Sequence, residues 1–247
     1  LIERKNNIRP RQEIEDNKII GFDMSASKFL ITKEIEFMNP RFYRMEEERL
    51  KRKHRKLSRK QKGSNNKLKG QYKLARFYSK INNRKKDWIH KITHLLSEHF
   101  DCIILEDLNI KGMQQFNSGI SKSVTLDFSW HQFTAILRYK LEQKGKHLIF
   151  IDRFFPSSKT CSNCGHINSQ LLLNERKWVC PDCSTELDRD INASINIRNK
   201  GLEILKENQI KIIKNNDTTV GPTGVAFREN LRLITQQFLR KKEATCL

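Results

Sequence analysis

Residues 152–197, DRFFPSSKTCSNCGHINSQLLLNERKWVCPDCSTELDRDINASINI, hold four of the six cysteines, and the rest of the chain is interpreted around them. The cysteines form two Cys-x-x-Cys pairs, Cys161/Cys164 and Cys180/Cys183, separated by fifteen residues. This spacing is typical of a zinc ribbon, in which two knuckles present four thiolates to one ion. Four sulfur ligands leave no open coordination position, so we expect a structural Zn²⁺.

Two disulfides in a secreted domain are the alternative explanation for the four cysteines. The turns Ser-Asn-Cys-Gly-His and Cys-Pro-Asp-Cys suit metal knuckles, and no stretch reads as a signal peptide. The sequence therefore favours the zinc ribbon.

The composition indicates a polyanionic partner. The 247 residues include 48 Lys and Arg against 28 Asp and Glu, a formal net charge of +20. Such an excess fits nucleic acid or an anionic membrane surface. No apolar run approaches the roughly 18 residues of a spanning helix, and no amphipathic anchor stands out, so nucleic acid is favoured. The length suits one large domain or two small ones.

Acidic residues occur where three buried segments end or begin. Asp23 lies near the end of an apolar run over residues 18–24, and Glu106 and Asp107 end a second run over residues 101–109. Asp188 and Asp190 stand at the start of a helix expected from about residue 190. An acid in a buried strand is costly unless it is paired or binds metal. An exposed strand-end aspartate and a helix N-cap remain the simpler interpretations of each segment alone.

The order of the expected elements predicts an RNase H-like α/β fold. Strands over residues 18–24, 29–32 and 35–38 are followed by helices, a strand over 101–109, a polar loop over 112–127, a helix over 128–144 and a strand over 147–152. A last helix follows the cysteines. In this fold the three acidic segments meet, and carboxylates there would hold two Mg²⁺ or Mn²⁺ ions for phosphodiester hydrolysis.

Residues 41–100 are expected to form two basic helices. The stretch RLKRKHRKLSRKQK over residues 49–62 is broken at Gly63, and a second helix resumes near Lys67. A run of charge is usually a solvated face, but charges of one sign repel one another unless phosphates neutralise them. We expect backbone contacts to nucleic acid, without base reading. The candidate contact residues are Lys51, Arg52, Lys53, Arg55, Lys56, Arg59, Lys60, Lys62, Arg84, Lys85 and Lys86.

The chain resembles the TnpB (OrfB) proteins of insertion sequences, RNA-guided DNA endonucleases related to type V CRISPR effectors. The matching stretches are IIGFDMSASKFL, NPRFYR, RKLSRKQKGSNN, ILEDLNIKGM, IDRFFPSSKTCSNCGH, WVCPDC and LDRDINASINI, over about residues 18–201. The resemblance implies that Asp23, Glu106 and Asp190 are the three RuvC acids, and it selects them over Asp107 and Asp188. It implies a two-metal-ion DNA endonuclease with guide RNA and target DNA as partners. It also implies a cytoplasmic, nucleoid-associated prokaryotic protein, with neither a membrane nor a small-molecule substrate.

The chain departs from this family at both ends. Family members carry a large N-terminal part that docks the guide and reads a motif beside the target, whereas fewer than 20 residues precede the first motif here. We expect residues 1–17 to be a linker or the remnant of a missing part. Residues 18–157 and 187–201 are expected to form the RuvC-like nuclease domain, residues 158–186 the ribbon, and residues 202–247 a tail.

Two other functions remain open from the sequence. A non-catalytic nucleic-acid-binding remnant or repressor would use the basic helices alone, although the presence of all three acids argues against it. A zinc-ribbon RNA-binding protein of ribosomal type explains the charge and the cysteines, but it leaves three acids in buried segments unexplained.

Overall fold

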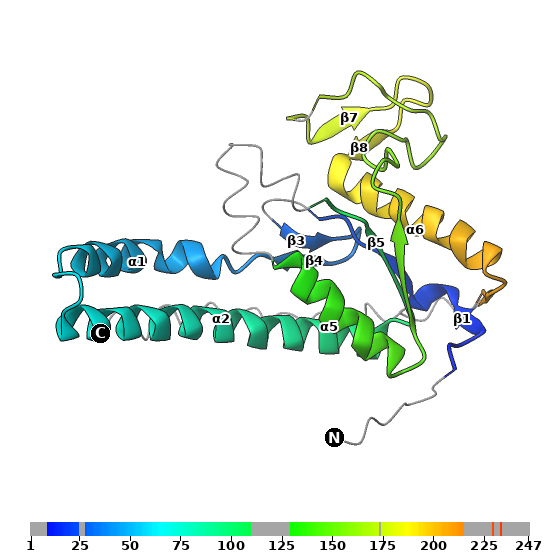
Figure 1. Ribbon diagram of the computed structural model, residues 1–247. Coiled ribbons are helices and arrows are strands. Elements are labelled where there is room, and N and C mark those ends of the chain that lie inside the picture. Colours follow the sequence, from blue (N-terminus) through cyan, green and yellow to red (C-terminus); the bar gives the residue numbers. More distant parts are fainter. Residues whose placement is uncertain are drawn as a thin grey trace.

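The computed structural model describes residues 9–24, 28–109, 129–172 and 174–214, together with Glu229 and Leu233. It is a mixed α/β structure in which helices cover a central sheet and a cysteine-containing ribbon lies beyond one end of that sheet (Figure 1). The polar loop expected over residues 112–127 lies outside the described residues.

Three parallel strands form the centre of the sheet. They are β2 (Ile19–Gly21), β5 (Cys102–Glu106) and β6 (His147–Ile151), in the order β2-β5-β6. Strand β5 is apolar along its first four residues, all buried, which is typical of a parallel strand covered on both faces.

An antiparallel hairpin extends this sheet beyond β2. Strand β3 (Lys28–Ile31) pairs with β4 (Glu36–Met38). Asp23 and Ile31 form an antiparallel bridge in which each backbone N–H donates to the other's carbonyl, at 3.0 and 2.8 Å. The strand order across the sheet is therefore β4-β3-β2-β5-β6, and every strand expected between residues 18 and 152 is present.

The two faces of β5 pack against different helices. Ile103 and Leu105 belong to the large core with α2 (Asn65–His99) and α5 (Trp130–Glu142). Cys102 and Ile104 face α6 (Arg189–Glu207), which packs closely because Gly201 lies against Ile104. A Cβ atom at Gly201 would lie only 2.3 Å from Ile104 Cδ1.

Two long helices form an arm that projects from this body. Helix α1 (Phe42–Ser58) and the first part of α2 run side by side away from the sheet, joined at a turn around Gly63 (Figure 1). Ser64 caps α2 by accepting a hydrogen bond from the backbone N–H of Lys67 at 3.2 Å. We call residues 42–86 the basic arm.

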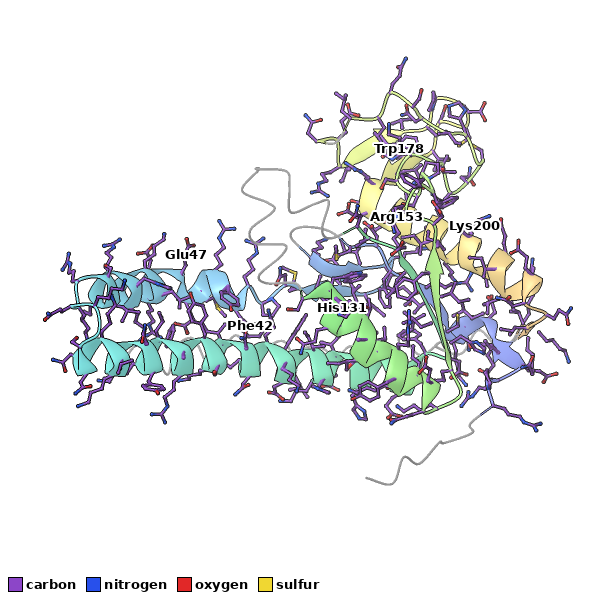
Figure 2. All side chains as sticks on the ribbon, in the orientation of Figure 1. Phe42, Glu47, His131, Arg153, Trp178 and Lys200 are labelled. Carbon is purple, nitrogen blue, oxygen red and sulfur yellow. The ribbon has the colours of Figure 1, made fainter. Side chains whose placement is uncertain are left out.

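The ribbon stands over the start of α6. Its hairpin consists of β7 (Lys177–Val179) and β8 (Glu186–Asp188), and α6 begins directly after β8 (Figure 1). Trp178, 7% exposed, packs inside the ribbon with the cysteines (Figure 2). The chain therefore passes from the ribbon into the helix that covers the sheet without an intervening linker.

The structure corrects the expectation for the two ends of the domain. Strand β1 (Glu13–Glu15), within the expected linker, pairs in parallel with β9 (Lys211–Ile213), within the expected tail. Ile14 is 1% exposed and packs with the α6 side of the core. Helix α6 also continues past residue 201 to Glu207. None of the helices in the described ranges has the length and apolar character needed to cross a bilayer.

Candidate functional site

The strand register brings two of the three predicted acids together. Strand β2 pairs with β5 so that Gly21 lies opposite Ile104, and Phe22 N–H donates to the Ile104 carbonyl at 3.0 Å. Continuing this register by two residues places Asp23 beside Glu106, the last residue of β5. Both acids therefore stand where neighbouring parallel strands end.

The electrostatics place Asp190 in the same region. Burial raises the pKa of Asp23 well above its ordinary value, and the negative charges of Glu106 and Asp190 raise it further. Burial also raises the pKa of Glu106, while the hydrogen bond donated by the Ser157 hydroxyl opposes this shift. The structure thus gathers Asp23, Glu106 and Asp190 into one group, which we call the acid cluster.

The neighbouring acids have other partners. Asp107 forms an exposed ion pair with Arg153. Asp188 is the N-cap of α6 and accepts hydrogen bonds from the backbone N–H groups of Asp190 and Ile191, both at 3.1 Å. The N-cap interpretation therefore holds for Asp188, and it leaves the carboxylate of Asp190 available for other contacts.

Arg176 of the ribbon contacts the acid cluster. Its Nη1 lies 3.0 Å from both carboxylate oxygens of Asp190. Its carbonyl also accepts a hydrogen bond of 2.8 Å from Arg189 N–H, which continues the β7–β8 ladder. No pattern in the sequence identifies this residue, because only the register of that hairpin shows that Arg176 lies across from the start of α6.

The acid cluster fits hard cations, although it is more open than a single-ion site. Carboxylate oxygens are the ligands that Mg²⁺ and Mn²⁺ prefer. A cation would also relieve the repulsion that raises the pKa of Asp23. Among the residues that the structure describes, only the four cysteines form a group of three or more potential ligands whose atoms are close enough to share one ion. The three acids lie too far apart for that.

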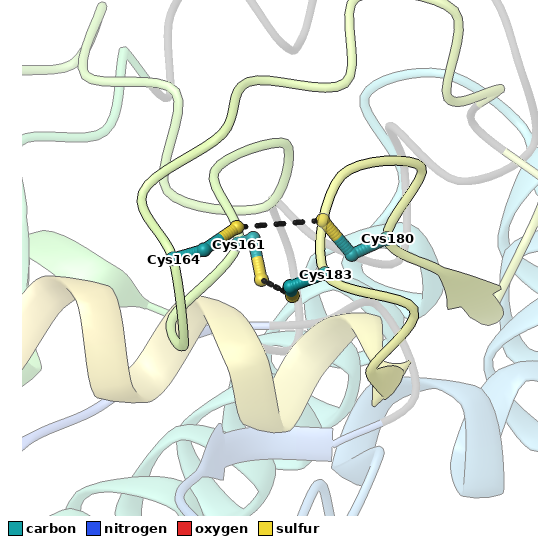
Figure 3. Close-up of side chains that lie close together, drawn as sticks. All are labelled: Cys161, Cys164, Cys180 and Cys183. Atoms are coloured by element: carbon teal, nitrogen blue, oxygen red, sulfur yellow. Dashed lines mark hydrogen bonds between the residues drawn. The ribbon is translucent and has the colours of Figure 1, made fainter.

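The four cysteines have the geometry of a metal site. Their Sγ atoms all lie within 4.8 Å of one another, and the pairs Cys161/Cys183 and Cys164/Cys180 are each 3.6 Å apart (Figure 3). A disulfide would require about 2.05 Å. Four sulfurs at about 2.3 Å from one tetrahedral zinc ion would be separated by about 3.8 Å. The cluster could therefore hold a metal ion and is consistent with Zn²⁺.

Both knuckles share one backbone conformation. Gly165 N–H donates to the Cys161 carbonyl and Ser184 N–H donates to the Cys180 carbonyl, both at 2.9 Å. Gly165 and Ser184 have φ values of +81° and +57°. This repetition at two separate turns is what two-knuckle metal binding requires, because each turn must direct a pair of sulfurs to one point.

Hydrogen bonds also favour the thiolate form of one ligand. Thr185, through its side chain and backbone, and then Asn163 lower the pKa of the Cys183 thiol to about 5. The Nδ2 of Asn163 lies 3.6 Å from Cys183 Sγ. The thiolate is the form that binds metals, so these two residues support the metal site.

Two buried asparagines of α6 join the ribbon to the acid cluster. Asn192 accepts from Ser162 N–H at 2.9 Å and donates to the Thr160 carbonyl at 2.7 Å. Asn196, one turn later, donates to the carbonyls of Thr160 at 2.6 Å and Ser157 at 2.8 Å. Since Ser157 also contacts Glu106, one network connects the cysteine ribbon with the acid at the end of β5.

The basic arm presents most of its predicted contact residues to solvent. Between Glu48 and Asp87 the sequence contains no acid. The exposed members of the predicted set are Lys51, Arg52, Arg55, Lys56, Arg59, Lys62 and Lys86, while Lys53 and Lys60 are half-buried. Lys51 pairs with Glu47 and Glu48, both at 3.0 Å.

Two predicted contact residues lie inside the arm. Lys85 is 7% exposed, and its ammonium lies over the ring of Tyr43. Arg84 pairs with Glu46 at 3.4 Å and lies over the ring of Phe42. The structure corrects the prediction for Lys85, whose stem and charge serve the packing of the two helices.

The fold has a counterpart among solved structures. The chain aligns with Cas12f1 in the cryo-EM structure of a Cas12f1–sgRNA–target DNA complex, with a TM-score of 0.50 and 20% identity, over 76% of this chain and 51% of that one. The fold is therefore of the Cas12f1 kind.

Two family models match consecutive parts of the sequence. Residues 3–117 match OrfB_IS605, described as a probable transposase, and residues 130–197 match the Cas12f1-like TNB domain. The chain belongs to the TnpB/OrfB_IS605 transposase family and carries a Cas12f1-like TNB domain.

Curated relatives carry names of the same kind. A "Putative RNA-guided DNA endonuclease" of Streptomyces pristinaespiralis is 38% identical over 66% of this chain and 40% of its own length. "Putative RNA-guided DNA endonuclease InsQ" of Escherichia coli K12 is 28% identical over 76% of this chain and 50% of its own length. The "TnpB-like protein MJ0012" of Methanocaldococcus jannaschii is 29% identical over 54% of this chain and 61% of its own length. The chain thus spans about half or less of the first two relatives.

Proposed function

We propose that this chain forms the RuvC-type, metal-dependent nuclease part of an RNA-guided DNA endonuclease. The observation that carries the proposal is the acid cluster, in which Asp23 lies beside Glu106 at the ends of neighbouring strands, and in which burial and then the charges of Glu106 and Asp190 raise the pKa of Asp23. Proteins rarely place two further acids around a buried carboxylate unless the group has a function. The strand order β4-β3-β2-β5-β6, with an antiparallel hairpin beside three parallel strands, supports the RNase H-like assignment.

Asp23, Glu106 and Asp190 would hold the divalent cations. When bound, Mg²⁺ or Mn²⁺ ions would supply an activated water and stabilise the leaving oxygen of a phosphodiester. The chain's own residues orient this group. The register of β2 against β5 fixes Asp23 beside Glu106, and the Ser157 hydroxyl holds the Glu106 carboxylate in place. Arg176 partly neutralises Asp190 and ties the ribbon to the start of α6.

The ribbon would hold one structural Zn²⁺ through Cys161, Cys164, Cys180 and Cys183. All four ligands would come from the protein, so the ion would contribute to folding and leave the chemistry to the acids. The same segment carries Arg176 and leads directly into α6, so zinc would also support the position of Asp190.

The basic arm would contact the phosphates of guide RNA and target DNA. Its exposed cations are spread along a helical surface that offers no aligned set of base-reading side chains. Base pairing between guide and target would then supply sequence recognition, as in other RNA-guided nucleases.

Single acid variants test the proposal. We expect Asp23→Ala, Glu106→Ala and Asp190→Ala each to abolish divalent-dependent nicking of single-stranded DNA while binding is retained. Asp107→Asn and Asp188→Asn are the matched controls, because these acids contact Arg153 and the helix cap. A readout independent of cleavage is the rise in melting temperature on adding Mg²⁺, which Asp23→Ala should lose.

Two outcomes would contradict this assignment. Cleavage that survives in all three alanine variants would remove the nuclease proposal and leave a nucleic-acid-binding function. Cleavage that survives Asp190→Ala but is lost in Asp188→Ala would move the third ligand by two residues.

A further inference from the structure

Phe154 is the most exposed of the large apolar side chains that the structure describes, at 85%. Its neighbour Phe155 packs against the α6 side of the core. Burial of a phenylalanine ring normally stabilises a fold, and this ring makes no such contribution here. The fold does not use Phe154 for its own stability.

An ordered turn directs the ring outward. Phe154 N–H donates to Asp152 Oδ1 at 2.7 Å, and Phe155 N–H donates to the Asp152 carbonyl at 3.1 Å. Ser157 N–H then donates to the Phe155 carbonyl at 2.8 Å. The backbone of the turn that carries Phe154 is therefore held by hydrogen bonds, while the ring itself lies exposed.

This turn is fastened to the strand end that carries Glu106. Arg153 forms its ion pair with Asp107, and the Ser157 hydroxyl donates to Glu106. Strand β6, which leads into the turn, pairs with β5 so that Ile151 lies opposite Glu106. Figure 2 shows Arg153 where β6 approaches the ribbon and the start of α6. Phe154 thus projects from a segment held against the acid cluster on both sides.

We propose that Phe154 stacks on an unpaired base of the DNA strand to be cleaved, next to the phosphate held at the acid cluster. This inference rests on the proposed nuclease function and names a residue that positions its substrate. An aromatic ring accepts every base, because each base has a π-face, and such stacking strengthens the binding of single strands without reading their sequence. It therefore suits an enzyme whose sequence recognition comes from base pairing. A base already stacked inside a duplex has no free face, so the substrate segment is single-stranded.

The test is a binding comparison in EDTA with a short single-stranded DNA that contains 2-aminopurine, whose fluorescence falls when it stacks on an aromatic ring. We expect Phe154→Ala to weaken binding about fivefold or more, the equivalent of 1 kcal/mol, and to abolish the fall in fluorescence. Phe154→Trp should retain both. The salt dependence should not change, because the substitution removes no cation that binds phosphate. Tyr139→Ala, a half-exposed aromatic of α5, is the control and should bind as the parent does.

The outcomes separate this proposal from the nuclease proposal. If the parent chain binds DNA and Phe154→Ala matches it in affinity and fluorescence, stacking is overturned while the nuclease assignment stands. If Phe154→Ala weakens binding to RNA of the same sequence but not to DNA, the assignment to the cleaved strand is overturned. A parent chain that binds no single-stranded DNA overturns both proposals.

Discussion

Asp23 combines burial with repulsion from two neighbouring acids, and this makes it sensitive to pH. Its pKa is higher in the folded than in the unfolded chain, so the folded state holds the proton more tightly. This contribution to stability is complete below the unfolded pKa and is lost as the pH rises through the folded pKa. Above the folded pKa the ionised carboxylate therefore destabilises the fold.

The variant Asp23→Asn should raise the melting temperature in EDTA at neutral pH, because asparagine has no carboxylate that must be buried in its charged form or protonated on folding. The gain should shrink as the pH falls below the ordinary pKa of an aspartate, where the parent chain is protonated too. Thermal unfolding across a pH series measures both effects. Asp107→Asn is the control and should show no gain, and an equal gain in that variant would mean that general charge reduction is responsible.

The two knuckles differ at one residue that occupies the left-handed region. Ser184 has φ +57°, a conformation that costs an L-residue roughly 1–2 kcal/mol, whereas Gly165 occupies it without strain. We expect Ser184→Gly to stabilise the ribbon by about 0.5–1 kcal/mol after the greater freedom of the unfolded glycine is counted. Gly165→Ala should destabilise it by a similar amount.

Competition with a zinc chelator during thermal unfolding measures both ribbon variants. A ribbon that is equally stable with serine or glycine at position 184 would contradict the strain argument. Loss of zinc from both variants would show instead that the turn residues matter for reasons other than their φ values.

Among the structural elements, α6 packs against the sheet and also binds the ribbon through its asparagines. Asn196 donates to the carbonyls of Ser157 and Thr160. Asn196→Ala removes the donor of the Ser157 carbonyl, whereas the Thr160 carbonyl keeps its hydrogen bond from Asn192. We expect a loss of about 1–3 kcal/mol in unfolding free energy. Backbone hydrogen exchange should also become faster over residues 157–162, because this segment loses the hydrogen bonds that Asn196 donates to it. Asn199→Ala, an exposed position three residues later, is the matched control and should change neither quantity.

The same elements show what the sequence could predict. Local patterns were enough for the strands, because apolar runs such as CIILE have few alternatives, and for the ribbon, because the cysteine spacing is specific. The side-chain contacts of α6 and the ribbon were not predictable in this way. Arg176 reaches Asp190 through a hairpin register, and Asn192 and Asn196 act on carbonyls more than thirty residues away.

The pairing of β1 with β9 was missed for a related reason. Each strand has only three residues, Glu13 and Lys211 are 198 positions apart, and both lie in polar surroundings. No local pattern can connect such segments, so charge and polarity suggested a linker and a tail. Lys85 shows the same effect within a helix, because its neighbours in the sequence are basic while its ammonium lies over the ring of Tyr43.

For the whole molecule, the uneven charge distribution predicts how binding responds to salt. Changing Arg52, Arg55, Lys56, Arg59 and Lys62 to Gln should weaken nucleic-acid binding about equally for all sequences. The log–log salt slope should fall by about 0.7–0.9 for each phosphate that the protein no longer neutralises. Fluorescence anisotropy over a range of salt concentrations measures this change.

Two single variants sharpen the comparison. Lys51 is neutralised by Glu47 and Glu48, whereas Arg55 forms no ion pair with the residues that the structure describes. Lys51→Gln should therefore change the slope less than Arg55→Gln. Unchanged slopes in the single variants and in the fivefold variant would mean that the arm is only a solvated surface.

The short β1–β9 sheet has a mechanical consequence. Because the two strands are parallel, a pull on the chain before Glu13 and after Ile213 acts in opposite directions along the strand axis. The hydrogen bonds between Glu13–Glu15 and Lys211–Ile213 are then loaded together in shear and cannot open one by one. The part of the fold between the two strands is thereby shielded from tension, and a force applied at the two ends would break the β1–β9 pairing before it disturbs the acid cluster.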